Sequence, residues 1–386
     1  MKRFIPFLIK IFIPFLLQAQ SFEIGHRSIT YNDPARSRNI PVHIYYPALS
    51  PGDNVAVANG QFPLIVFGHG FAMSWSAYNN IWEFLIPYGY FIVFPTTEGS
   101  LIPAPNHGEF GKDIFFLNEK MKSESTNPSS PFYQKLNNKS AFMGHSMGGG
   151  AAFLASANNS NFNTLIALAP ANTSPSAIDT CPYINTQTLI FFGENDGVTP
   201  PLEHQLPMYD SLSSDCKTII GILGGGHCFF ANYNFYCATG EAATNPQPTI
   251  SRQEQHDILF DFLKPYLDFI LKDNASSEQI FLDSLVNSNR IVFQRQCINN
   301  QLNKIDKIPF HIFPNPVIQN NEINIMLTNN ISNCKIEIKD IQGRILFHKN
   351  TSENNIKINP HKLSNGMYFI YLSFGKVTFT EKIIVL

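Results

Sequence analysis

The segment of residues 140–152 constrains the fold of this chain more than any other. An apolar run at 141–143, typical of a short buried strand, breaks at Gly144, and beyond Ser146 three glycines and two alanines open a helix. This is Gly-x-Ser-x-Gly between a strand and a helix, the pattern of a nucleophile elbow. The pattern stands Ser146 on a sharp turn and needs small residues where strand and helix approach closely. The alternative is a glycine-rich turn that carries an incidental serine.

Apolar runs that alternate with helical patterns surround this segment. The runs, which are typical of strands covered on both faces, are residues 63–67, 91–94, 164–168, 187–192 and 218–223. A half-buried strand is expected at 39–46, and helices are expected at 78–85, at 112–121 and over a last segment whose apolar face runs from 258 to 270. The last helix begins with a capping box at 251–254, and we expect Pro265 to kink it. The alternation predicts an α/β-hydrolase fold with a doubly wound, mostly parallel sheet.

Candidate catalytic residues follow the strands of this predicted sheet. Functional loops in such sheets lie at the carboxyl ends of the strands. After Ser146, Asp196 follows the run at 187–192, and His227 ends a glycine-rich loop after the next run. The order Ser, Asp, His is that of α/β-hydrolases. We therefore predict Ser146 as nucleophile, His227 as general base and Asp196 as the acid that orients the imidazole.

Other residues compete for these roles. Glu194 is the alternative acid. His204 lies too near Asp196 in sequence to fold back over it, and His256 lies in the last predicted helix. A strand-end aspartate often caps a turn, and His227 could be an ordinary loop histidine. Their joint occurrence in order favours the triad, and we interpret His145 as a packing residue.

The same loops supply candidates for the oxyanion hole and the substrate pocket. We expect the amides of Met147 and Phe71 to bind an oxyanion, the second from the turn at 68–72. That turn could also be an ordinary tight turn. Nearby aromatic residues either line an apolar acyl or aryl subsite or belong to the core: Phe71, Trp75, Tyr78, Trp82, Phe229 and Phe230. Phe71, Trp75 and Phe229 are the substrate-binding candidates.

The N-terminus and the cysteines indicate export. Residues 1–19 have a basic start, an apolar stretch and a small residue suited to cleavage, which predicts a signal peptide. Six cysteines in an exported chain can pair. Cys228 and Cys237, close together in one loop, are the favoured bridge. The pairing of Cys181, Cys216 and Cys297 stays open, and Cys334 is expected to be free.

Composition excludes several classes of function. The formal net charge of −2 gives no electrostatic case for a nucleic-acid or anionic-membrane partner. No cysteine or histidine spacing predicts a zinc site, and a triad needs no metal or organic cofactor. We expect a monomer that binds an ester or polyester substrate.

These motifs resemble a known family over residues 40–272. The segments 144–150, 194–196, 206–211 and 225–227 are similar to the secreted cutinase-like polyester hydrolases. That group includes the poly(ethylene terephthalate) hydrolases and dienelactone-hydrolase-like relatives. The resemblance implies the triad of Ser146, Asp196 and His227 and the oxyanion pair of Phe71 and Met147.

The chain departs from this family in three places. The loop at 171–176 lacks the usual tryptophan, no cysteine lies near Gly193 for a site-flanking disulfide, and the insert at 228–248 is longer than expected. The resemblance therefore supports ester hydrolysis more than a polyester substrate. Open alternatives are a polyester hydrolase proper, a lipase, a peptidase of this fold, a structural surface protein and a catalytically inactive adhesin on the same scaffold.

The last part of the chain is a different module. Short strands are expected at 322–327, 334–338, 344–348, 356–358, 367–372 and 376–385, which predicts a small β-sandwich. The segments 313–316, 340–344, 363–368 and 382–385 resemble the type A C-terminal sorting domain of the type IX secretion system. A substrate- or carbohydrate-binding module is the alternative. The resemblance implies the export machinery as partner and a location outside the outer membrane.

These observations divide the chain into four parts. We expect a signal peptide at 1–19, a catalytic domain at 20–299, a linker at 300–311 and a sorting domain at 312–386.

Overall fold

The computed structural model describes most of the two expected domains. The described residues are 21–297, 310–318, 321–327, 334–353, 355–359, 363–374 and 377–386. The predicted signal peptide and nearly all of the predicted linker lie outside them. Within the described ranges, no helix has the length and apolar character needed to cross a bilayer.

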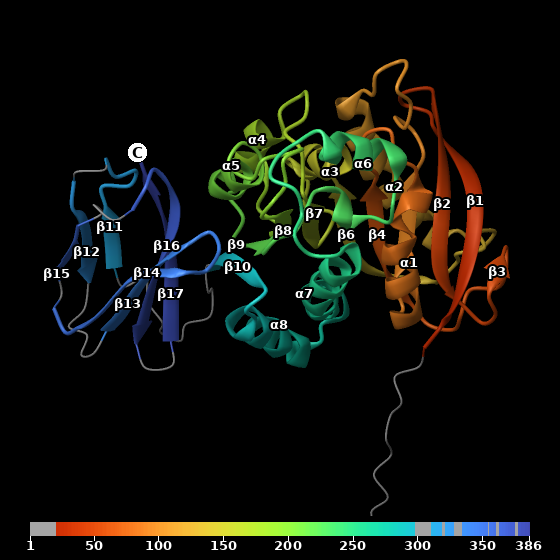
Figure 1. The fold of residues 1–386 in the computed structure, drawn as a ribbon. Helices are drawn as coiled ribbons and strands as arrows, with labels where there is room; N and C mark the ends of the chain where they lie inside the picture. The colour runs from red at the N-terminus through yellow and green to blue at the C-terminus, as the bar shows by residue number, and fades with distance from the viewer. Residues whose placement is uncertain are drawn as a thin grey trace, which may run out of the picture.

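A ten-stranded sheet forms the centre of the N-terminal domain (Figure 1). Its order is β10-β9-β8-β7-β6-β4-β5-β2-β1-β3. Neighbours from β9 to β5 are parallel, whereas β10, β2 and β1 join antiparallel to β9, β5 and β2. The strands are β1 (Glu23–Asp33), β2 (Arg38–Ala48), β3 (Gly52–Asp53), β4 (Phe62–Gly68), β5 (Phe91–Pro95), β6 (Leu136–His145), β7 (Thr164–Leu168), β8 (Gln187–Gly193), β9 (Cys216–Ile222) and β10 (Ile291–Cys297). The predicted α/β-hydrolase fold with a mostly parallel sheet is confirmed.

Helices cover both faces of this sheet. The α-helices are α1 (Asn79–Leu85), α2 (His107–Thr126), α3 (Met147–Ser156), α4 (Ala177–Thr180), α5 (Gln205–Ser211), α6 (Phe235–Ala242), α7 (Arg252–Lys272) and α8 (Ala275–Asn287). Short 3-10 helices are η1 (Trp75–Tyr78), η2 (Ile86–Tyr88), η3 (Cys181–Tyr183) and η4 (Cys228–Phe230). One core cluster packs beneath α2, α3, α4 and α5, and the other beneath α1, α7 and α8.

The central strands are apolar throughout because both of their faces are covered. In β4, Leu64 and Val66 join the first core cluster, while Ile65 and Phe67 join the second. Side chains that alternate across a strand reach opposite faces. A continuous apolar run is therefore what a strand between two helical layers requires.

Several strands and α-helices of this domain were not anticipated from the sequence, among them β1, β3, α4, α5, α6 and α8. β1 is half-exposed and mixes charged and apolar residues, α6 lies inside the long insert, and α8 follows α7 after a short break. Their apolar stripes are too short to give a clear periodic pattern in the sequence. Their stability comes mainly from packing against neighbouring elements, such as the sheet or α7. Ser251 caps the N-terminus of α7, since its Oγ accepts from the Glu254 amide at 3.1 Å. α7 continues through Pro265.

Two disulfides join parts of this domain. Cys228 pairs with Cys237, as the sequence favoured. Cys216 pairs with Cys297 across the antiparallel strands β9 and β10, which settles the second pairing that the sequence left open. Cys181 and Cys334 are free and buried.

The C-terminal domain is all-β, as predicted. One sheet has the order β11-β12-β15 and the other β14-β13-β16-β17, with buried isoleucines such as Ile325 and Ile336 in a shared core. The strands are β11 (Phe310–Phe313), β12 (Ile323–Leu327), β13 (Cys334–Asp340), β14 (Ile345–Thr351), β15 (Asn355–Ile358), β16 (Gly366–Phe374) and β17 (Val377–Val385). Phe369 of β16 packs into the core cluster of the N-terminal domain.

Candidate active site

The turn between β6 and α3 holds Ser146 in a strained conformation. Its φ of 55° and ψ of −121° lie outside the regions that L-residues usually adopt. The turn closes only around glycines. A Cβ on Gly144 would lie 2.3 Å from the Gly148 carbonyl oxygen, and one on Gly148 would lie 2.1 Å from the Gly68 carbonyl oxygen. The elbow is therefore packed directly against the end of β4.

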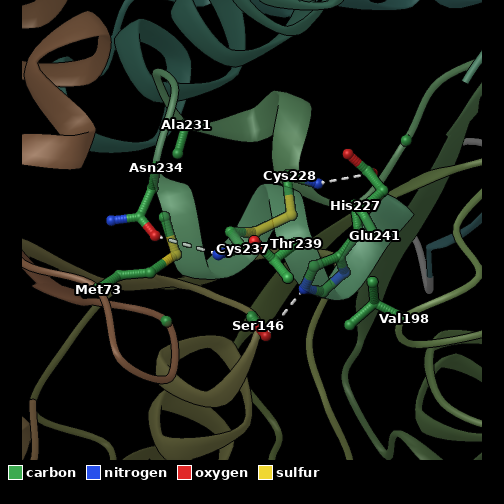
Figure 2. Close-up of a disulfide and its surroundings, with 12 residues drawn as sticks. Met73, Ser146, Val198, His227, Cys228, Ala231, Asn234, Cys237, Thr239 and Glu241 are labelled. Carbon is green, nitrogen blue, oxygen red and sulfur yellow. Dashed lines mark hydrogen bonds between the residues drawn. A yellow bond between two sulfur atoms is a disulfide. The ribbon is translucent and has the colours of Figure 1, made fainter. Parts of the chain in front are cut away.

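Three side chains from three strand ends form one hydrogen-bonded chain. Ser146 Oγ lies 2.9 Å from His227 Nε2, and His227 Nδ1 lies 2.8 Å from Asp196 Oδ2 (Figure 2 shows the first contact). All three are buried, with exposures of 9%, 1% and 2%. Because a carboxylate only accepts, Nδ1 carries the proton and Nε2 is left to accept from the serine hydroxyl. This geometry fits a general base beside a nucleophile.

The carboxylate of Asp196 is held by donors on both oxygens. Oδ1 accepts from the amides of Val198 at 2.9 Å and Thr199 at 2.7 Å. Oδ2 accepts from Thr199 Oγ1 at 2.9 Å as well as from His227. The Thr199 hydroxyl in turn accepts from Gln205 Nε2 at 3.0 Å. Sequence analysis missed Thr199 and Gln205, although a threonine three residues after a strand-end aspartate is a turn signal.

The alternative residues have other partners. Glu194 Oε2 accepts from the Gly224 amide at 2.8 Å, and burial raises the pKa of this carboxyl. His204 Nδ1 accepts from the Asn172 amide at 2.8 Å, and His256 Nε2 lies 3.1 Å from Asn80 Nδ2. Within the described residues, no group of three or more His, Cys, Asp and Glu side chains is arranged to hold a metal ion.

The backbone near Ser146 presents two candidate oxyanion donors. Met147 is the first residue of α3, where helix geometry leaves amides without intrahelical partners. The Gly70 carbonyl accepts from the Met73 amide at 3.1 Å. This bond fixes the peptide between Gly70 and Phe71, and in a trans peptide the N–H points opposite to the carbonyl. The Phe71 amide is therefore turned away from the loop interior.

A cavity of about 570 Å³ lies beside the oxyanion loop. Its lining includes Met73 and Trp75, Ser100 from the loop after β5, and Tyr236 of α6. Phe71 is 49% exposed. Of the predicted substrate-binding residues, Trp75 thus reaches a cavity and Phe71 reaches solvent. The Phe229 ring lies instead under the Arg252 guanidinium, 4.4 Å away, while Tyr78 and Phe230 are core residues.

The insert after His227 folds over the site as α6. The disulfide from Cys228 to Cys237 joins this helix to the histidine loop, beside the pair Ser146–His227 in Figure 2. Glu241 Oε1 accepts from the Cys228 amide at 3.0 Å, which makes a second link. Asn234 caps the helix by accepting from the Cys237 amide at 3.1 Å. The wall of the cavity is therefore held to the residue that follows His227.

Comparison with known proteins gives two family matches. A model described as PET hydrolase-like matches residues 41–242, which contain the elbow, Asp196 and His227. A model described as a secretion system C-terminal sorting domain matches residues 311–386.

A curated relative matches the first of these regions only in part. The bis(hydroxyethyl) terephthalate hydrolase of Streptomyces coelicolor is 26% identical over 171 residues, which are 44% of this chain and 49% of the relative. The chain thus spans about half the length of the relative that it matches.

Proposed function

The chain belongs to the PET hydrolase-like family, and from this premise we propose that it is a serine hydrolase of hydrophobic carboxylic esters, polyesters included, which forms an acyl-enzyme on Ser146. The observation that carries the proposal is the buried hydrogen-bonded chain from Ser146 through His227 to Asp196. Family membership supports ester hydrolysis as the reaction class, and the chain of hydrogen bonds supports the serine mechanism.

Acylation uses these groups in sequence. His227 Nε2 takes the hydroxyl proton as Ser146 Oγ attacks the ester carbonyl carbon, and the carbonyl π electrons move to the oxygen. The amides of Phe71 and Met147 stabilise this oxyanion. When the tetrahedral adduct collapses, the C–O bond to the alcohol breaks and His227 gives its proton to the leaving oxygen. Asp196 stabilises the imidazolium throughout.

Deacylation repeats the steps with water. His227 takes a proton from a water molecule as the water oxygen attacks the acyl carbon. The ester bond to Ser146 Oγ then breaks, the carboxylic acid leaves and the proton goes to Ser146 Oγ. The products are a free alcohol and a carboxylic acid.

Aromatic diesters are the substrate class that we favour. The relative is named for the hydrolysis of bis(hydroxyethyl) terephthalate, an ester of an aromatic diacid. The cavity beside the oxyanion loop has walls suited to an aryl group, with Trp75 and Tyr236 for stacking and Met73 for sulfur–aromatic contact.

The C-terminal domain determines where the enzyme acts. It is a type IX sorting domain, so the protein is exported to the cell surface or beyond the outer membrane. We propose that residues 1–19 are the signal peptide for passage through the inner membrane, and that residues 300–311 are the linker between the catalytic and sorting domains. Catalysis then requires residues 20–299 alone.

An ester panel tests the proposal. The full chain and Ser146→Ala are assayed on p-nitrophenyl esters of increasing chain length, on bis(hydroxyethyl) terephthalate and on an aromatic polyester film. We expect hydrolysis that disappears in Ser146→Ala, and soluble aromatic acid from the film marks a polyester hydrolase. Wild-type protein that cleaves none of these esters would contradict the proposal and favour a binding scaffold.

A further inference from the structure

We propose that Tyr78 and His145 are positioning residues that hold the oxyanion loop, the nucleophile elbow and the histidine loop in register. The inference rests on the proposed ester hydrolysis, because it assigns a task within that reaction. Both residues are fully buried, and their side chains hydrogen-bond to Gly70, to each other and to the His227 carbonyl rather than to Ser146 Oγ or His227 Nε2. They act through the three backbone segments that they join.

Four groups form a continuous hydrogen-bonded path behind the site. The Gly70 amide donates to the Tyr78 hydroxyl oxygen at 2.8 Å. The same hydroxyl lies 2.9 Å from His145 Nδ1. His145 Nε2 lies 3.0 Å from the carbonyl oxygen of His227. The path therefore begins beside Phe71, passes beside Ser146 and ends on the backbone of the catalytic histidine.

The direction of every proton in this path follows from its partners. A carbonyl oxygen only accepts, so His145 Nε2 carries a proton and donates to His227. Burial, together with the neighbouring His227, keeps the pKa of His145 well below its ordinary value, so the imidazole is neutral. Its Nδ1 is then an acceptor 2.9 Å from the Tyr78 oxygen and takes the hydroxyl proton in preference to Met73 Sδ, a weaker acceptor at 3.3 Å. The Tyr78 oxygen is left to accept from Gly70, and all four groups are satisfied at once.

The oxyanion loop packs tightly against the two side chains. A Cβ on Gly70 would lie 2.8 Å from Met73 Sδ, 3.1 Å from the Tyr78 hydroxyl and 3.3 Å from His145 Nδ1. Gly70 is also the residue whose carbonyl bond to Met73 orients the next peptide. A shift of Tyr78 or His145 therefore turns the peptide that presents the Phe71 amide.

Removal of one oxygen atom tests this role. Tyr78→Phe leaves the Gly70 amide and His145 Nδ1 without their Tyr78 partner in a buried site. Tyr266→Phe is the matched control, because Tyr266 is also buried and its hydroxyl lies 2.8 Å from Thr164 Oγ1, away from the three loops. Tyr78→Phe loses two neutral buried hydrogen bonds and Tyr266→Phe loses the one to Thr164, so a purely structural effect lowers Tm in both.

The expected result separates positioning from stability. Tyr78→Phe should lower kcat about 10- to 100-fold with KM within about twofold, measured well below its Tm. Tyr266→Phe should keep its kcat within about twofold. His145→Gln, whose amide can still donate to the His227 carbonyl, should recover part of the rate that His145→Leu loses. A kcat of Tyr78→Phe equal to that of the control overturns the proposal.

A second readout does not depend on ester turnover. Hydrogen exchange measured by mass spectrometry should speed up in Tyr78→Phe for peptides covering residues 68–73 and 226–231, and not in the Tyr266→Phe control. Unchanged exchange in both peptides refutes the path. If the wild-type protein has no esterase activity but exchange is faster in Tyr78→Phe and not in Tyr266→Phe, the proposed function is refuted and the hydrogen-bonded path is still supported.

Discussion

Thr199→Val tests how strongly the support of Asp196 contributes to catalysis. The substitution keeps the side-chain shape and removes the hydroxyl that donates to Asp196 Oδ2 at 2.9 Å. It also removes the acceptor of Gln205 Nε2, which keeps its bond to the Pro170 carbonyl at 2.8 Å. The carboxylate retains two backbone amides and the imidazole N–H.

The expected magnitude follows from these partners. A hydrogen bond to a charged group contributes about 1.5–3 kcal/mol, which is about 10- to 100-fold in rate if it is expressed fully in the transition state. Because three donors to Asp196 remain, we expect the lower end, a fall in kcat of about tenfold. Loss of the whole carboxylate function costs about 10⁴-fold in triad enzymes.

Steady-state kinetics on a soluble p-nitrophenyl ester measures this effect. Thr188→Val is the control, since Thr188 of β8 is also buried and donates to the Thr186 carbonyl at 2.9 Å. We expect its kcat to stay within about twofold of wild type. A Thr199→Val enzyme with the kcat of the control would show that the hydroxyl is not needed. A fall near 10⁴-fold would mean that Thr199, rather than the backbone amides, holds Asp196 in place.

Three further predictions concern the elbow, the disulfides and acid stability. Gly148→Ala places a Cβ 2.1 Å from the Gly68 oxygen, so the elbow must move by about 1 Å and kcat should fall by about 10²-fold. A kcat near that of wild type would refute the close approach of the elbow to β4. Cys297→Ser opens a bridge across 81 residues and Cys237→Ser one across 9. The losses expected in urea unfolding are about 4.5 and about 2.7 kcal/mol, and the reverse order would contradict the loop argument. Burial lowers the pKa of His145 in the folded protein. Below about pH 6.5, the unfolded chain therefore binds a proton at this residue that the folded chain does not. The free energy of unfolding then decreases as the pH is lowered, by up to about 1.4 kcal/mol per pH unit. Tm between about pH 7 and pH 5 should fall less steeply in His145→Gln, and equal slopes would assign the loss to other groups.

The catalytic candidates were predictable because each is marked by local sequence. Ser146 stands between glycines at the junction of an apolar run and a helix, and His227 ends a glycine-rich loop. Asp196 and Glu194 were harder to separate, since both follow β8. The structure brings Asp196 to His227 and turns Glu194 to the Gly224 amide. That difference depends on the turn after β8, which the sequence pattern does not specify.

The supporting residues were not predictable because their partners are distant in sequence. Tyr78 and His145 are separated by 67 residues; the sequence suggested a packing role for His145 and left Tyr78 open between the core and a substrate subsite. α6 is a short helix whose position depends on a disulfide and on the contact between Glu241 and Cys228. Long-range pairing of this kind leaves no periodic signal in the chain.

Trapping the acyl group tests the central claim most directly. The full chain is mixed with a p-nitrophenyl ester, quenched in acid within its first turnovers, digested and analysed by mass spectrometry. We expect the peptide that contains Ser146 to gain the mass of the acyl group, and Ser146→Ala to gain none. Ester hydrolysis without an adduct on Ser146, or with an adduct on another residue, would contradict the account.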